Sequence, residues 1–195
     1  MKLYLLRHGE TEYNAKHYYQ GSRDLSLSEE GRAKLGRADF GAEVVYVTPL
    51  KRTAQTAQVL FPNARLEVVE GLREMNFGIF EGRSDAEMVG EPEYDAWLAS
   101  EWQLPCPGGE AWADFAARSC AALDGLIRAA HARGEERLVV VAHGGTQMAV
   151  LHRHARPRRK LVEWLGKNGG GYVLDTGRWE DEGILTLLEE VFWPR

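Results

Sequence analysis

The chain has 195 residues, of which 44% are hydrophobic and 27% are charged, proportions that are ordinary for a globular protein. A chain of this length buries enough apolar surface to fold without a metal ion or a disulfide. The formal net charge of -5 argues against a protein that binds nucleic acid or an anionic membrane through its overall charge.

In chain order, the first half alternates apolar runs with segments of helical spacing. Ser28 is a suitable helix N-cap, because acidic residues follow it in the first turn. The predicted elements are a buried strand at residues 3–6, a helix from Ser28 through Leu35, a second buried strand at residues 44–47, a helix from Pro49 through Leu60, and a more exposed strand at residues 66–69.

The second half begins with an irregular stretch that contains bulky aromatic residues. We expect a helical insertion near residues 84–109, and a lid over the functional site is one hypothesis for it. The predicted elements that follow are a long amphipathic helix from about Glu110 to His131, a central strand at residues 138–142, a helix after Gly145, and two closing strands at residues 172–174 and 184–188 around a turn at Gly183.

This alternation of strands and helices predicts the α/β class. We expect a three-layer α/β/α sandwich in which a mostly parallel central sheet is covered on both faces. No repeat and no long linker divides the chain, so residues 1–195 are predicted to form a single domain.

Charged and imidazole side chains follow the predicted strands, where ligands of such folds bind. The first strand leads into Arg7 and His8, and the second into Arg52. The third strand leads towards Glu74, and the central strand into His143. We therefore expect these five residues to lie together at one edge of the sheet.

This set of residues is typical of phosphoryl transfer. Arg7 and Arg52 provide permanent charges that match the phosphate oxygens. His8 is the candidate nucleophile, because a neutral imidazole attacks well near neutral pH, and His143 is placed to donate a hydrogen bond to the phosphate. Glu74 is the candidate for protonating the leaving alkoxide and later deprotonating water. The arginines and histidines neutralise the phosphate charge, so no metal is required.

Several segments, in register along nearly the whole chain, resemble the histidine phosphatase superfamily, which includes the cofactor-dependent phosphoglycerate mutases. They are residues 6–14 (LRHGETEYN), 27–31 (LSEEG), 48–57 (TPLKRTAQTA), 72–82 (LREMNFGIFEG), 107–110 (PGGE) and 141–145 (VAHGG). The resemblance implies a phosphoglycerate mutase-like fold, a phosphohistidine at His8, a phosphate pocket of Arg7, Arg52 and His143, and Glu74 as the proton donor.

The same resemblance implies further ligand contacts. Asn14 and the backbone of Gly144 are expected to help bind phosphate, and Gln20 and Gly21 lie in a segment that often faces the substrate. No cofactor and no metal are implied. The expected ligand is a small phosphomonoester.

Two features favour a phosphatase over a mutase of this superfamily. Met75 follows Glu74 where mutases usually have arginine, and the chain is short. Residues 74–82, 94–97 and 101–103 resemble α-ribazole-5′-phosphate phosphatases of cobalamin nucleotide-loop assembly, although Phe80 replaces the usual tryptophan. The alternatives are a broad-specificity phosphatase of sugar phosphates or nucleotides, a cofactor-dependent phosphoglycerate mutase, a phosphate-binding module, and a metallohydrolase that uses both histidines with Glu74.

Other sequence features predict the setting of the protein. The basic run at residues 152–160 is interpreted as a solvated helix end and loop, and no nucleic-acid partner is expected. No apolar stretch approaches the length of a membrane span, and the N-terminal run is too short for a signal peptide. Cys106 and Cys120 have no metal-type spacing, so we expect free thiols in a cytoplasmic protein that is a monomer or a homodimer.

Overall fold

The computed structural model describes residues 1–195 and contains a seven-stranded sheet. The strands are β1 (Lys2–Arg7), β2 (Val44–Val47), β3 (Arg65–Val68), β4 (Arg137–Ala142), β5 (Ala155–Arg156), β6 (Gly170–Arg178) and β7 (Ile184–Phe192). Six of these match strands predicted from the sequence. The sequence did not indicate β5, which has only two residues.

Eight α-helices and three short 3₁₀ helices connect the strands. The α-helices are α1 (Glu12–Ala15), α2 (Glu29–Ala33), α3 (Lys51–Leu60), α4 (Asp85–Met88), α5 (Pro92–Ala99), α6 (Trp112–Ala132), α7 (Gly144–His154) and α8 (Trp179–Glu182). The 3₁₀ helices are η1 (Glu70–Leu72), η2 (Gly78–Phe80) and η3 (Leu161–Trp164).

Ser28 is the N-cap of α2, as predicted, and its side chain accepts a hydrogen bond from the amide of Gly31. The prediction that this helix continues through Leu35 is wrong, because α2 ends at Ala33. Leu35 instead pairs with Pro194 in an isolated antiparallel bridge, so a contact with the distant end of the chain determines its backbone.

The strand order β3-β2-β4-β1-β6-β7-β5 confirms a mostly parallel sheet. Strands β3, β2, β4 and β1 run parallel to one another. Strand β6 pairs antiparallel with β1 and with β7. The carboxyl ends of β1, β2 and β4 therefore meet at one edge, which is where the charged residues follow them in the sequence.

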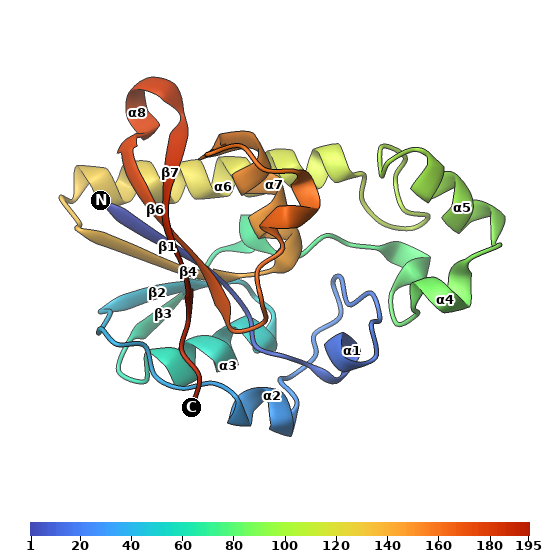
Figure 1. Ribbon diagram of the computed structural model, residues 1–195, viewed down its shortest axis with the longest axis horizontal. Helices are drawn as coiled ribbons and strands as arrows, with labels where there is room; N and C mark the ends of the chain where they lie inside the picture. Colours follow the sequence, from blue (N-terminus) through green and yellow to red (C-terminus); the bar gives the residue numbers. More distant parts are fainter.

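The two faces of the sheet bury separate cores, which confirms the three-layer sandwich. Alternate residues of β1 divide between the faces: Leu3 and Leu5 pack with α6 and α7, while Tyr4 and Leu6 pack with α3. Figure 1 shows α6 and α7 on one side of the twisted sheet and α3 on the other. Period-two alternation in a strand that is buried on both faces produces this division.

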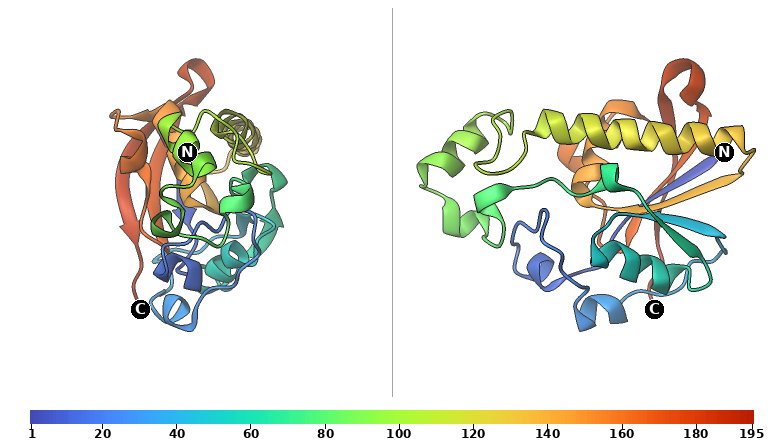
Figure 2. Two further views of the ribbon diagram at one scale, coloured as in Figure 1. Left: turned by 90° about the vertical axis from the view of Figure 1, so that its right-hand side faces the viewer. Right: turned by 180° about the vertical axis from the view of Figure 1, so that it is seen from behind.

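Residues 84–109 form the predicted helical insertion, with α4 and α5 projecting beyond the end of the sheet (Figures 1 and 2). The insertion has an apolar cluster of its own, in which Tyr94 and Trp97 pack against Phe80 and against Phe115 of α6. This cluster joins the insertion to the rest of the fold. Movement of the insertion as a lid stays a hypothesis.

Two smaller observations concern the whole chain. Both cysteines are buried free thiols. None of the helices has the length and apolar character that crossing a membrane requires.

Candidate active site

A cavity of about 470 Å³ opens at the carboxyl ends of β1, β2 and β4. It brings together residues from separate stretches of the chain, which are Arg7, His8, Asn14, His17, Tyr18, Tyr19, Gln20, Gly21, Arg52, Glu74, Phe77, Asp85, Gly144, Gly145, Leu165 and Asn168. All the site residues expected from the sequence line it except His143. That residue is fully buried behind His8, with a distance of 5.4 Å between the two ring centroids.

The hydrogen bonding of His8 defines which ring nitrogen can react. Its Nδ1 lies 2.7 Å from the carbonyl oxygen of Gly9. A carbonyl oxygen only accepts, so Nδ1 must carry the hydrogen. The lone pair is then on Nε2, which makes no hydrogen bond within the chain. The backbone immediately after β1 thus selects the tautomer that a nucleophilic imidazole needs.

The surroundings of His8 also keep its ring neutral. Burial lowers the pKa of His8 well below its ordinary value, and the charges of Arg52 and Arg7 lower it further. An imidazole with a lowered pKa remains uncharged, and therefore nucleophilic, across the neutral range.

Three buried nitrogen atoms around the cavity have no partner in the chain. They are Nε of Arg7, Nε of Arg52 and Nδ1 of His143. A buried donor without a partner costs about 1–3 kcal/mol. Grouped next to His8, these atoms indicate a place where an oxyanion supplies the missing hydrogen bonds.

Arg52 is fully buried and is held by backbone carbonyl groups from a single loop. Its two terminal nitrogens donate to the carbonyl oxygens of Arg23, at 2.7 Å, and Gly21, at 2.9 Å. These bonds fix the plane of the guanidinium and leave Nε for a ligand. Arg7 is held similarly, because one terminal nitrogen donates to the carbonyl oxygen of Gly166 at 2.8 Å.

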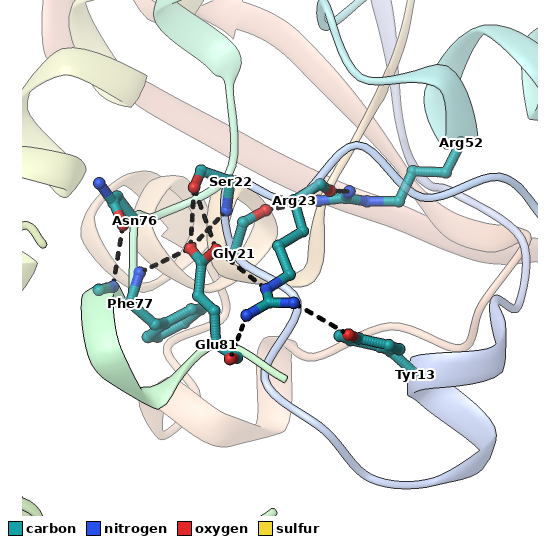
Figure 3. A network of polar contacts seen from close by, with 9 residues as sticks. Tyr13, Gly21, Ser22, Arg23, Arg52, Asn76, Phe77 and Glu81 are labelled. Carbon is teal, nitrogen blue, oxygen red and sulfur yellow. Dashed lines mark hydrogen bonds and ion pairs between the residues drawn. The ribbon is translucent and has the colours of Figure 1, made fainter. Parts of the chain in front are cut away.

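Glu81 holds the loop that holds Arg52 (Figure 3). Its buried carboxylate accepts hydrogen bonds from the amide and hydroxyl of Ser22 and from the amide of Phe77. Gly21 must be glycine here: its φ is +53°, and an added Cβ would lie 2.0 Å from Glu81 Oε1. Glu81 is a glutamate close to Glu74 in the sequence, but it does not line the cavity. Its hydrogen bonds give it a structural role.

Thr48 fixes the ring of His143. The Thr48 hydroxyl lies 2.9 Å from His143 Nε2, and the neighbouring Thr53 hydroxyl donates to the carbonyl oxygen of Leu50. When the Thr48 hydroxyl donates to Nε2, the ring hydrogen lies on Nδ1, which has no partner in the chain. In this tautomer His143 can donate to a phosphoryl group bound on His8.

Glu74 lies against the start of α7. Its two carboxylate oxygens accept hydrogen bonds from the amides of Met75, at 3.0 Å, and Gly145, at 3.3 Å. Burial raises the pKa of Glu74, while these amides and the two arginines oppose the shift. A raised pKa keeps the proton on the carboxyl group to higher pH, which suits a general acid.

Arg118 of α6, which the sequence reasoning missed, supports the segment that carries Glu74. Its guanidinium donates to the carbonyl oxygens of Gly71, Arg73 and Glu74. It also forms a two-point ion pair with Glu110. The helical pattern of α6 gives no sign of the carbonyl contacts, because those partners lie more than 40 residues away.

The amide side chains of the cavity are held through their oxygen atoms. Asn14 Oδ1 accepts from Thr11 and from Asn168, and Gln20 Oε1 accepts from the Thr11 hydroxyl. The NH₂ groups of Asn14 and Gln20 make no hydrogen bond within the chain and can donate to a ligand. Asn168 also donates to the carbonyl oxygen of His8, a contact that the sequence did not indicate. Gly144 begins α7, and amides in the first turn of a helix lack intrahelical partners.

The remaining wall residues were also missed from the sequence. They are His17, Tyr18, Tyr19, Phe77, Asp85 and Leu165. No group of three or more histidine, cysteine, aspartate or glutamate side chains is arranged to hold a metal ion.

A buried neutral imidazole, unpaired arginine nitrogens and a carboxyl group with a raised pKa can together move a phosphoryl group. A family model for the histidine phosphatase superfamily (branch 1) matches residues 3–180. The chain belongs to the histidine phosphatase superfamily. Its members are phosphatases and mutases, so the protein is an enzyme of this superfamily.

Curated relatives in the superfamily differ in the activities for which they are named. The chain is 32% identical to a putative phosphoserine phosphatase 2 of Hydrogenobacter thermophilus, over 77% of this chain and 76% of that one. It is 31% identical to a 2,3-bisphosphoglycerate-dependent phosphoglycerate mutase of Brucella canis, over 76% of this chain and 79% of that one. The alignment with the mutase covers similar shares of both chains, so the two chains have similar lengths. Chain length therefore does not separate phosphatases from mutases.

Solved structures share the fold of this histidine phosphatase. An α-ribazole phosphatase from Shigella flexneri superposes with a TM-score of 0.76 at 23% identity, covering 96% of this chain and 95% of that one. A phosphoglycerate mutase from Thermus thermophilus superposes with a TM-score of 0.72 at 28% identity, covering 98% of each chain. These two structures share the architecture of the chain and differ in the activity for which they are named.

Proposed function

We propose that this enzyme is a metal-independent phosphomonoester hydrolase that acts through a phosphohistidine on His8, with α-ribazole 5′-phosphate as its favoured substrate. The observation that carries the proposal is the hydrogen bond from His8 Nδ1 to Gly9, which leaves Nε2 free beside the unpaired nitrogens of Arg7 and Arg52.

The first step transfers the phosphoryl group to the enzyme. The lone pair of His8 Nε2 attacks phosphorus, and the bond between phosphorus and the ester oxygen breaks. Glu74 gives its proton to the leaving oxygen, so the alcohol departs neutral and the glutamate becomes a carboxylate. Arg7 and Arg52 bind the equatorial oxygens throughout, which supplies the charge stabilisation that a phosphoryl transition state requires.

The second step transfers the phosphoryl group to water. The Glu74 carboxylate takes a proton from a water molecule, whose oxygen attacks phosphorus. The bond between phosphorus and Nε2 breaks, which restores neutral His8 and releases inorganic phosphate. His143, through Nδ1, donates to the phosphoryl oxygens in both steps.

The residue after the acid supports hydrolysis over mutase activity. Met75 is buried in the apolar cluster of the insertion and does not line the cavity. It therefore adds no positive charge for the carboxylate of a phosphoglycerate. Arg7 and Arg52 are the only arginines that line the cavity, no lysine lines it, and both arginines are committed to the phosphoryl group.

Two features support α-ribazole phosphate among possible esters. The segments at residues 74–82, 94–97 and 101–103 resemble the phosphatases of that ester. They build η2, α5 and the turn after it, and Glu74 and Phe77 of the first segment line the cavity. The cavity is also large enough for more than a phosphate, and aromatic rings form part of its wall. A substrate with a ring system suits such a wall.

The test is phosphate release in the presence of a chelator from α-ribazole 5′-phosphate, 3-phosphoglycerate, phosphoserine, a sugar phosphate, a nucleotide and an aryl phosphate. The variants are His8→Ala and, as a matched control, His152→Ala at the exposed end of α7. We expect the highest kcat/KM with α-ribazole phosphate and its loss in His8→Ala alone.

Other outcomes contradict separate parts of the proposal. Release that survives in His8→Ala contradicts the nucleophile. Equal rates across the panel contradict the substrate and favour the broad-specificity alternative. Isomerisation of 3-phosphoglycerate that needs a bisphosphoglycerate primer, without release of phosphate, establishes a mutase.

A further inference from the structure

The rim of the cavity has the opposite charge to its floor. Asp85, the first residue of α4, lines the cavity and is exposed, whereas Arg52 at the floor is fully buried. The Asp85 side chain forms no ion pair with any residue of the chain, and its Oδ2 makes no hydrogen bond. A carboxylate repels phosphate, so Asp85 does not contribute to binding the phosphoryl group and is available to contact another part of the substrate.

A chain of phenol groups orients this carboxylate. The Tyr94 hydroxyl donates to Asp85 Oδ1, and the Tyr19 hydroxyl lies 3.1 Å from that of Tyr94. Because Tyr94 uses its hydrogen on Asp85, Tyr19 must donate to Tyr94. Burial and the contact with Asp85 raise the pKa of Tyr94 to about 12, and burial with the contact to Tyr94 raises that of Tyr19, so both phenols stay protonated. Asp85 is therefore held by groups that leave one oxygen free.

Aromatic surfaces flank the carboxylate. Tyr18, Tyr19 and Phe77 line the same cavity and are only partly buried. The rings of Tyr19 and Phe77 lie 5.0 Å apart between centroids. The rim thus combines apolar ring faces with one hydrogen-bond acceptor that carries a negative charge.

We infer that this rim selects the alcohol part of the substrate, with Asp85 as a specificity-determining residue: it accepts leaving groups that present hydroxyl or ammonium donors and rejects those that carry a second anionic group. The inference rests on the proposed hydrolase and adds the substrate class. A second carboxylate or phosphate would meet Asp85 and no further arginine or lysine, because Arg7 and Arg52, which also line the cavity, bind the phosphoryl group in the proposed mechanism. Like charges that lie close together repel appreciably outside bulk water.

The test compares two esters that differ in one group. Glycerol 3-phosphate and 3-phosphoglycerate have the same carbon skeleton, and a hydroxymethyl group in one replaces the carboxylate of the other. We expect the enzyme to favour glycerol 3-phosphate by roughly tenfold in kcat/KM. Asp85→Asn keeps an oxygen for the Tyr94 hydroxyl and removes the charge, and it should reduce this preference to near unity.

Controls separate this inference from the proposed function. Glu93→Gln removes an exposed carboxylate of α5 that does not line the cavity, and it should leave the preference intact. In each variant the kcat/KM of both esters is compared with that of an aryl phosphate without further polar groups, which gives Asp85 neither a donor nor a second anion. Added salt should narrow the preference of the unmodified enzyme.

An unchanged preference in Asp85→Asn, or an enzyme that favours 3-phosphoglycerate, overturns the inference while leaving the hydrolase intact. If the unmodified enzyme hydrolyses neither ester, the result contradicts the proposed function instead. In that case the affinities for glycerol 3-phosphate and 3-phosphoglycerate are measured by calorimetry, on His8→Ala and on the double variant that also carries Asp85→Asn. An equal ratio of the two affinities in both variants overturns the inference.

Discussion

Gly145 gives a direct means of testing Glu74 as the proton donor without replacing it. A Cβ added at residue 145 would lie 2.3 Å from Glu74 Oε1, against about 3.4 Å for an ordinary contact. Gly145→Ala therefore forces the carboxyl group to move by about 1 Å. A misplacement of that size costs on the order of 100-fold in rate. Gly125→Ala is the control, because nothing lies within 4 Å of its added Cβ.

The assay compares two esters with each variant. An alkyl phosphate needs its leaving oxygen protonated, whereas a dinitrophenyl phosphate does not. We expect Gly145→Ala to lose about 100-fold in kcat/KM with the alkyl ester and far less with the aryl ester. Gly125→Ala should keep full activity and gain about 0.5–1 kcal/mol of stability, since alanine replaces glycine within α6. Equal losses with both esters would refute the reasoning, because they would indicate damaged phosphate binding.

Three further predictions concern charge and ligand binding. Because the pKa of Glu74 is raised, activity on alkyl esters should persist above the pH range in which an ordinary carboxyl group loses its proton. It should then fall as the pH rises through the raised pKa. Glu74→Gln should remove this fall from the pH–rate profile. Arg52→Lys cannot keep both bonds to Gly21 and Arg23, so kcat/KM should fall at least tenfold in steady-state assays. Inorganic phosphate at about 100 times its Kd should stabilise the enzyme by about 2.7 kcal/mol in thermal melts, and Arg52→Lys should need far more phosphate for the same shift.

The sequence predicted those features that depend on neighbouring residues. The strand at residues 44–47 has the bounds that its apolar run indicated, and the helix predicted from about Glu110 to His131 is α6, Trp112–Ala132. The position of Arg7, His8 and Arg52 at or shortly after the ends of their strands was enough to bring them together, because parallel strands share one carboxyl edge.

The sequence could not predict contacts between distant segments. Arg118 reaches carbonyl groups more than 40 residues away, and Asn168 reaches His8 across 160 residues. Asp85 gave no signal, because an exposed acid at a helix start is common. The side-chain hydrogen bond of Thr48 to His143 likewise exists only once β2 and β4 pair. These groups position and surround the residues that the motifs marked.

The central claim is that His8 Nε2 carries the phosphoryl group. The most direct measurement is rapid acid-free quenching during turnover of a labelled phosphomonoester, followed by peptide mass spectrometry and a test of acid lability. The account predicts one acid-labile phosphoryl group per chain, on His8, present in the Gly125→Ala control and absent from His8→Ala. Turnover without any labelled protein, or a label on His143 or Glu74, would contradict it.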